Sequence, residues 1–157
     1  MARLLAALAA MTGRDAARGA LHLERDIAAL QGDDAGDITI ATSTYFASRW
    51  LSPRLMTFMA DHPNVGLRLQ PLVDLMDLRK SGADIVITTA QIPGRDAPRL
   101  VHKTTLDKMK AGSVLIDMAA GTGGNVEGAV AEQTITTDNG VRIVGAANIP
   151  SMLAAQS

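Results

Sequence analysis

Apolar residues follow a helical period at the start of the chain and a strand-like pattern from residue 37 onward. Residues 4–11 carry leucines at near-helical spacing, and a second apolar stripe runs through residues 16–30. We therefore expect residues 1–31 to form N-terminal helices. The second stripe would pack either on the chain's own core or against a second copy of the chain, and the pattern leaves both open.

Five short stretches rich in β-branched and aliphatic residues follow, and helical segments separate them. The predicted strands are 37–42, 65–70, 84–89, 114–118 and 141–145. Thr134–Thr137 adds a weaker strand, which Asp138-Asn139-Gly140 joins to the last one by a hairpin turn. Strands that alternate with helices indicate a mostly parallel sheet with helices on both faces.

The helical segments between the strands have recognisable start signals. Ser43-Thr44-Tyr45 is a cluster of N-cap residues, and Pro53 suggests that the helix proper starts near Ser52. Further helices are expected over 73–80, from Thr104 or Thr105 through Met109, and from Pro150 to the end of the chain.

Composition narrows the range of functions. The 157 residues carry a net charge of −1 and contain no cysteine, which argues against a basic nucleic-acid-binding face and excludes thiol chemistry. No apolar stretch approaches the roughly 20 residues of a membrane span, so we expect a cytoplasmic protein without membrane or nucleic-acid partners. The three histidines and the acidic residues show no metal-ligand spacing, and no metal site is expected.

Residues 14–83 resemble the effector-binding domain of LysR-type transcriptional regulators. The resemblance is carried by Gly36–Ala41, by Ser48–Leu55 together with Phe58, and by His62–Val65. It covers only the first half of that family's first effector subdomain, and the domain that reads DNA has no counterpart in this sequence.

Residues 83–157 resemble a different family, the NAD-binding alpha subunit of proton-translocating nicotinamide nucleotide transhydrogenase. The resemblance is carried by Ala83–Ala90, Ile92–Arg95, Met109–Ala120 and Gly123–Asn125. It implies the second half of a Rossmann domain.

The two resemblances overlap at Ala83–Ile85, which points to a chimera joined at an equivalent strand. We therefore expect a single α/β domain over residues 1–157, with residues 36–83 as the LysR-like half and 83–157 as the transhydrogenase-like half. The expected sheet is doubly wound, flavodoxin-like or Rossmann-like, with strand order 2-1-3-4-5 and an extra N-terminal helical segment. A ligand would lie beyond the carboxyl ends of strands 1 and 3, at the switch point.

Candidate binding residues lie at these strand ends. The first strand is followed by Thr42-Ser43-Thr44-Tyr45, so the glycine-rich fingerprint of dinucleotide sites is missing. The transhydrogenase resemblance implies that Thr89, Ala90, Gln91 and Asn125 lie beside the dinucleotide. The LysR resemblance implies a small anion or carboxylate at Ser43 and Thr44. The alternative is that these loops only cap strands and that Ser43 or Thr44 is a simple N-cap.

The missing fingerprint leads us to expect no native catalytic function and no catalytic residue. The chain would be an engineered or fused α/β chimera, comparable to a de novo protein, whose main property is folding. The alternative is a small-molecule binding module that keeps weak NAD(H) or small-anion binding, as a transhydrogenase remnant inactive alone. The sequence establishes no cofactor beyond this weak NAD(H) binding, and a homodimer could form through the N-terminal helix or a sheet edge.

Overall fold

The computed structural model describes residues 37–61, 63, 65–72, 78 and 82–146, and the structural statements below concern these residues. The predicted helices over 1–31 and after Pro150 lie outside them. Of the predicted helix over 73–80 only Leu78 is described, and it is helical and buried.

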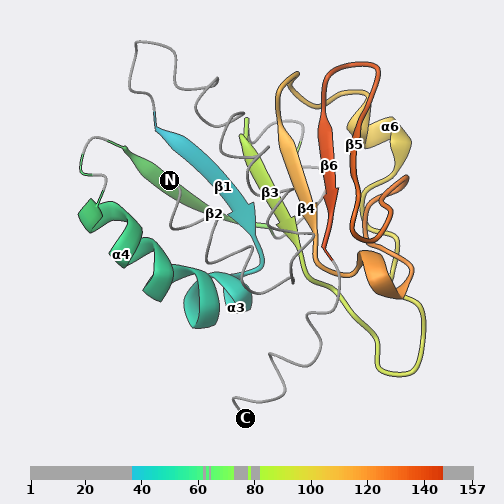
Figure 1. The fold of residues 1–157 in the computed structure, drawn as a ribbon, viewed down its shortest axis with the longest axis horizontal. Helices are drawn as coiled ribbons and strands as arrows, with labels where there is room; N and C mark the ends of the chain where they lie inside the picture. Colours follow the sequence, from blue (N-terminus) through green and yellow to red (C-terminus); the bar gives the residue numbers. More distant parts are fainter. Residues whose placement is uncertain (1–36, 62, 64, 73–77, 79–81, 147–157) are drawn as a thin grey trace.

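Six strands form one sheet, in the order β2-β1-β3-β4-β6-β5 (Figure 1). The strands are β1 (Ile38–Thr42), β2 (Leu67–Pro71), β3 (Ile85–Thr88), β4 (Val114–Asp117), β5 (Thr134–Thr136) and β6 (Arg142–Gly145). Every neighbouring pair is parallel except β5 and β6, which form an antiparallel hairpin. The predicted doubly wound, mostly parallel sheet is confirmed, because the five parallel strands follow the expected order.

The register between β1 and β3 joins the two halves of the chain. Ile40 lies opposite Ile85, and Ala41 lies opposite Val86. The prediction that strands 1 and 3 are neighbours is thus confirmed.

The sheet is covered on both faces because successive side chains of a strand point to opposite sides. Ile85 and Ile87 of β3 belong to one buried cluster, whereas Val86 belongs to the other. β4 repeats this division, with Leu115 on the opposite face from its two neighbours. Both strands are fully buried, as continuous apolar runs predict for the centre of a parallel sheet.

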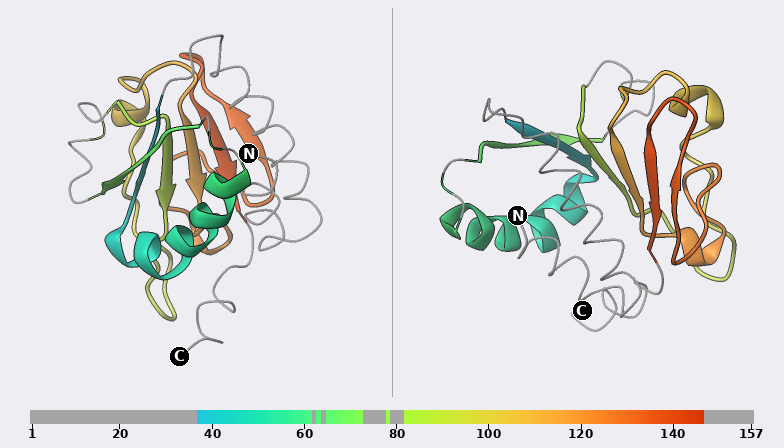
Figure 2. Two further views of the ribbon diagram at one scale, coloured as in Figure 1. Left: turned by 90° about the vertical axis from the view of Figure 1, so that its left-hand side faces the viewer. Right: turned by 45° about the horizontal axis from the view of Figure 1, so that its top comes forward.

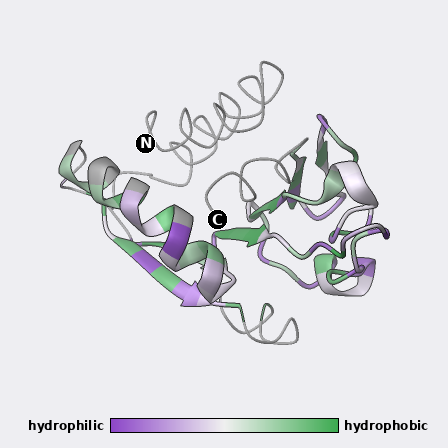
Figure 3. Cartoon of the chain, turned by 90° about the horizontal axis from the view of Figure 1, so that it is seen from below, coloured by the Kyte–Doolittle hydropathy of each residue, from purple (hydrophilic) through white to green (hydrophobic). Residues whose placement is uncertain are grey.

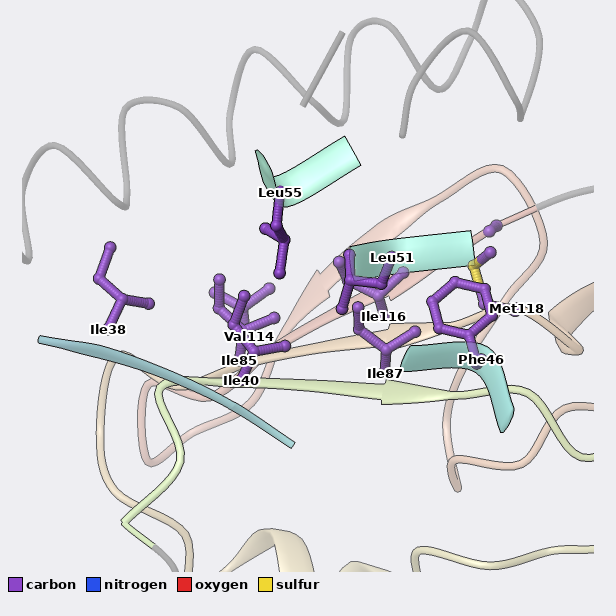
Figure 4. Packing of buried hydrophobic residues seen from close by; sticks show 11 residues of the cluster. Ile38, Ile40, Phe46, Leu51, Leu55, Ile85, Ile87, Val114, Ile116 and Met118 are labelled. Carbon is purple, nitrogen blue, oxygen red and sulfur yellow. The ribbon is translucent and has the colours of Figure 1, made fainter. Parts of the chain in front are cut away.

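A continuous helical segment covers the first face. It begins as α3 (Thr44–Phe46), widens into the π-helical turn η1 (Ala47–Leu51) and continues as α4 (Ser52–Asp61) (Figure 2). Leu51 and Leu55 point from this helix toward the strand residues in Figure 4. Hydrophilic and hydrophobic residues alternate along the helix in Figure 3, as expected for a helix that lies on a sheet.

The prediction that the helix proper starts near Ser52 is confirmed, because α4 begins at Ser52 with Pro53 in its first turn. The helical segment also extends back through η1 and α3 to Thr44, directly after the predicted N-cap Ser43. Pro53 has no N–H to donate and its ring crowds the preceding turn. The π turn, in which the Ser52 N–H bonds to the Ala47 carbonyl, lies directly before the proline and carries the chain past it without ending the helix.

The second face is covered by the chain between β3 and β4. This connection contains α6 (Lys103–Leu106), which is shorter than the helix predicted through Met109. Leu106 and Met109 are nevertheless both buried against the sheet. None of the helices in the described ranges is long and apolar enough to cross a membrane.

Candidate functional site

The strand order places a switch point between β1 and β3. The chain leaves β1 toward β2 on one side, and it leaves β3 toward β4 on the other. The two connections therefore diverge at the carboxyl ends of these strands, where open α/β sheets bind ligands. The arrowheads of β1, β3 and β4 point to this edge in Figure 1, next to the start of α3.

Two predicted residues, Ser43 and Thr89, meet across the switch point. The Ser43 Oγ and Thr89 Oγ1 atoms lie 3.3 Å apart, at hydrogen-bonding distance. Ser43 also caps α3, because its Oγ accepts a hydrogen bond from the Phe46 N–H at 3.4 Å. Thr44, the next residue, is exposed. The structure thus brings the two halves of the predicted site together.

Asn125 reaches from the loop after β4 to the loop after β3. Its Oδ1 accepts a hydrogen bond from the Ala90 N–H at 3.0 Å, and its Nδ2 donates to the Ala90 and Pro98 carbonyls, both at 2.9 Å. The side chain is completely buried. Ala90 is half-buried and Gln91 is exposed. Asn125 therefore holds the loop that carries Ala90 and Gln91.

Asp117 holds the loop after β4 through hydrogen bonds to its main chain. It is fully buried at the end of β4, and its two carboxylate oxygens accept hydrogen bonds from the Ala119 and Val126 N–H groups, both at 2.9 Å. Gly124 must approach this carboxylate closely. An added Cβ there would lie 3.1 Å from Asp117 Oδ2, and the φ of +79° favours glycine.

Arg99 is a site residue that the sequence did not reveal. Its guanidinium donates to the Val126 carbonyl at 3.0 Å and to the Gly123 carbonyl at 3.2 Å. It thereby ties the chain after β3 to the turn after β4. No motif marks this arginine, because its partners are backbone carbonyls that lie 24 and 27 residues further along the chain.

The described part of the chain contains no group of three metal-ligating side chains. The buried polar residues at the site are Thr42, Thr88, Asp117 and Asn125. Thr42 donates to the Ile87 carbonyl at 3.0 Å, and Thr88 to the Ile116 carbonyl at 3.5 Å, so each hydroxyl bonds to the neighbouring strand. The site is thus a hydrogen-bonded frame with exposed residues at its rim.

A doubly wound sheet with its loops gathered at a switch point defines the Rossmann-like class of α/β domains. The family model "Alanine dehydrogenase/PNT, C-terminal domain" matches residues 9–157 of this chain. The chain therefore belongs to that family.

Individual relatives match shorter segments. The NAD(P) transhydrogenase subunit alpha of Haemophilus influenzae is 53% identical over 74 residues, which are 47% of this chain and 14% of that protein. The AhcY transcriptional activator HvrB of Rhodobacter capsulatus is 44% identical over 50 residues, which are 32% of this chain and 17% of that protein. These matches span less than a fifth of either relative.

The fold is shared with a solved transhydrogenase structure from Sinorhizobium meliloti. The TM-score is 0.54 and the sequence identity is 28%, and the match covers 98% of this chain and 49% of that chain. The resemblance of the second half of the sequence to the transhydrogenase alpha subunit is therefore confirmed.

The expectation that the chain has no native function and exists mainly to fold is wrong. A single family model runs through the supposed junction at Ala83–Ile85 and covers both halves of the sheet. Part of the chain is also 53% identical to a protein named as the alpha subunit of NAD(P) transhydrogenase. The absence of the glycine fingerprint after β1 misled the sequence interpretation, because a chain can belong to this family without that motif.

Proposed function

We propose that this chain binds NAD(H) in the crevice at the carboxyl ends of β1, β3 and β4. The observation that carries the proposal is the meeting of Ser43 and Thr89 across the switch point, 3.3 Å apart, in a member of the alanine dehydrogenase/PNT family. A relative that is named as a subunit of NAD(P) transhydrogenase supports the choice of cofactor.

The rim residues have separate roles in this proposal. Thr89, Ala90 and Gln91 form the loop that lies against the dinucleotide, and Thr89 and Ala90 are partly buried whereas Gln91 is exposed. Ser43 and Thr44 face the phosphates, because the first N–H groups of a helix lack intrahelical partners and carry partial positive charge. The chain has side chains where a typical fingerprint has glycine, which limits how closely a pyrophosphate approaches and weakens the binding.

The chain alone would bind the nucleotide without transferring hydride. The relative is named as an alpha subunit, which supports partner subunits for turnover. Contact with a second copy through the N-terminal segment or a sheet edge remains a prediction.

Calorimetric titration of the 157-residue chain with NADH tests the proposal. We expect a Kd on the order of 100 μM or tighter, equivalent to at least about −5.5 kcal/mol. Ala90→Trp should abolish the heat, because the indole would fill the crevice. Ala111→Trp is the matched control, since Ala111 is exposed near the amino end of β4, at the opposite edge of the sheet, and should leave binding unchanged.

An unmodified chain that gives no binding heat with millimolar NADH would contradict the proposal. Equal loss of binding in the two tryptophan variants would also contradict it, because the effect would then not depend on the crevice.

We also propose that residues 14–83 are related to LysR-type regulators. The similarity to a transcriptional activator supports this relation. A small carboxylate would then compete with NADH at Ser43 and Thr44. We expect a small carboxylate to displace NADH from the unmodified chain but not from the Ser43→Ala variant. If the carboxylate still displaces NADH from that variant, the result argues against the relation.

A further inference from the structure

We infer that Asp117 and Asn125 act in series as positioning residues that hold the loop after β3 in its nucleotide-binding shape. This inference rests on the proposed NAD(H) site but assigns to Asn125 a different task from ligand contact. Asp117 fixes the turn after β4, the turn fixes Asn125, and Asn125 fixes Ala90.

The first link is the carboxylate of Asp117. Each of its two oxygens accepts one main-chain N–H, from Ala119 at one end of the turn and from Val126 at the other. The carboxyl group is fully buried, and a buried polar group left without hydrogen bonds is costly, so both hydrogen bonds favour this one shape of the turn. One side chain is thus hydrogen-bonded to both ends of the turn over 119–126.

The second link is the amide of Asn125. It bonds to both the N–H and the carbonyl of Ala90, as a neighbouring strand would, and its second N–H bonds to Pro98. The main-chain carbonyl of Asn125 accepts the N–H groups of Leu100 and Val101 at 2.8 and 2.9 Å. Both ends of the loop over 90–100 are therefore attached to this one residue.

The two links are joined by the chain itself. Val126, which Asp117 holds, directly follows Asn125, so the position of the Val126 N–H determines where the Asn125 side chain emerges. Gly124 lies next to this contact, because a Cβ there would be 3.1 Å from Asp117 Oδ2 and 3.7 Å from the Val126 carbonyl oxygen. The carboxylate at the end of β4 thus acts on Ala90 through the turn, without touching the loop after β3.

A double-mutant cycle on NADH affinity tests whether the two residues act in series. Asp117→Asn places an amide N–H against one of the two main-chain N–H groups, and Asn125→Ala removes all three bonds to the loop. We expect each change to raise the Kd about tenfold, and the double variant to be no weaker than Asn125→Ala alone. Additive effects of about a hundredfold would overturn the series arrangement.

Hydrogen exchange of the Ala90 amide gives a readout that needs no nucleotide. In both variants this amide should exchange much faster, while the Ile87 amide in the centre of β3 keeps its protection. Ser113→Ala is the control, because Ser113 is equally buried but lies just before β4, at the other edge of the sheet. It should leave both the Ala90 exchange rate and the Kd unchanged.

The two proposals can fail separately. If the unmodified chain does not bind NADH, the proposed function fails, and the exchange of Ala90 still decides the series arrangement. If NADH binds and Asp117→Asn leaves Ala90 protected, the series arrangement is wrong and nucleotide binding stands. If Asp117→Asn does not fold, Gly124→Ala disturbs the same turn, and unchanged Ala90 exchange in that variant would equally overturn the inference.

Discussion

Polar residues at the site divide into a buried frame and an exposed rim. Thr42, Asp117 and Asn125 are almost completely buried, and each bonds to main-chain groups. Burial of a polar group is costly unless it is hydrogen-bonded, so these side chains fix the shape of the loops. Thr44 and Gln91 are exposed and are available to a ligand.

Ser43 has a measurable role in stability apart from any ligand. Its Oγ accepts the Phe46 N–H at the start of the helix, so Ser43→Ala should lower the free energy of unfolding by about 0.5–1 kcal/mol. Urea denaturation measures this loss. Ser48→Ala is the matched control, because the Ser48 hydroxyl is exposed and bonds only to the Tyr45 carbonyl, and its effect should be near zero. Equal losses in both variants would show that Ser43 does not act as a cap.

At the scale of elements, the strands were easier to predict than the helices. The residues of β3 and β4 form short apolar runs, and such runs are typical of strands buried on both faces. The predicted start near Ser52 matches the first residue of α4, but the π turn that precedes α4 was not predicted. A π turn is a backbone arrangement that no residue pattern specifies.

The contacts within the loops were even harder to predict from residue patterns than the helices. The resemblance to transhydrogenase singled out Asn125 as a cofactor-binding candidate, and the structure shows it hydrogen-bonded to Ala90. Asn125 holds the loop after β3 through hydrogen bonds to Ala90 and Pro98, which are 35 and 27 residues away in the sequence, so only the structure shows this role. Arg99 escaped notice for the same reason, since its partners are carbonyls that every residue carries.

At the scale of the whole molecule, the two halves share one sheet. β1 pairs with β3, and β3 pairs with β4, so the first half cannot separate without breaking the ladder. Each face of the sheet also has a core drawn from both halves of the chain. We therefore expect the described α/β unit to unfold as one cooperative structure.

Substitution of a core residue in the second half tests this cooperativity. Leu115→Ala should lower the free energy of unfolding by about 3 kcal/mol, because it leaves a cavity at a fully buried position. Fluorescence of Trp50, the single tryptophan and part of the first half, should report the same shifted transition as far-UV circular dichroism. A Trp50 transition that stays at its original midpoint would mean that the halves unfold separately.

The sequence by itself determined the strands and their parallel arrangement, because these follow from local hydrophobic periodicity and from the alternation of strands and helices. The order of the strands, which brings the carboxyl ends of β1 and β3 together at one edge, was predicted from the two family resemblances. Tertiary structure alone decided which polar side chains hold the loops at that edge. Asp117, Arg99 and Asn125 act on backbone groups brought near only by the closed sheet, and backbone groups leave no mark in a sequence.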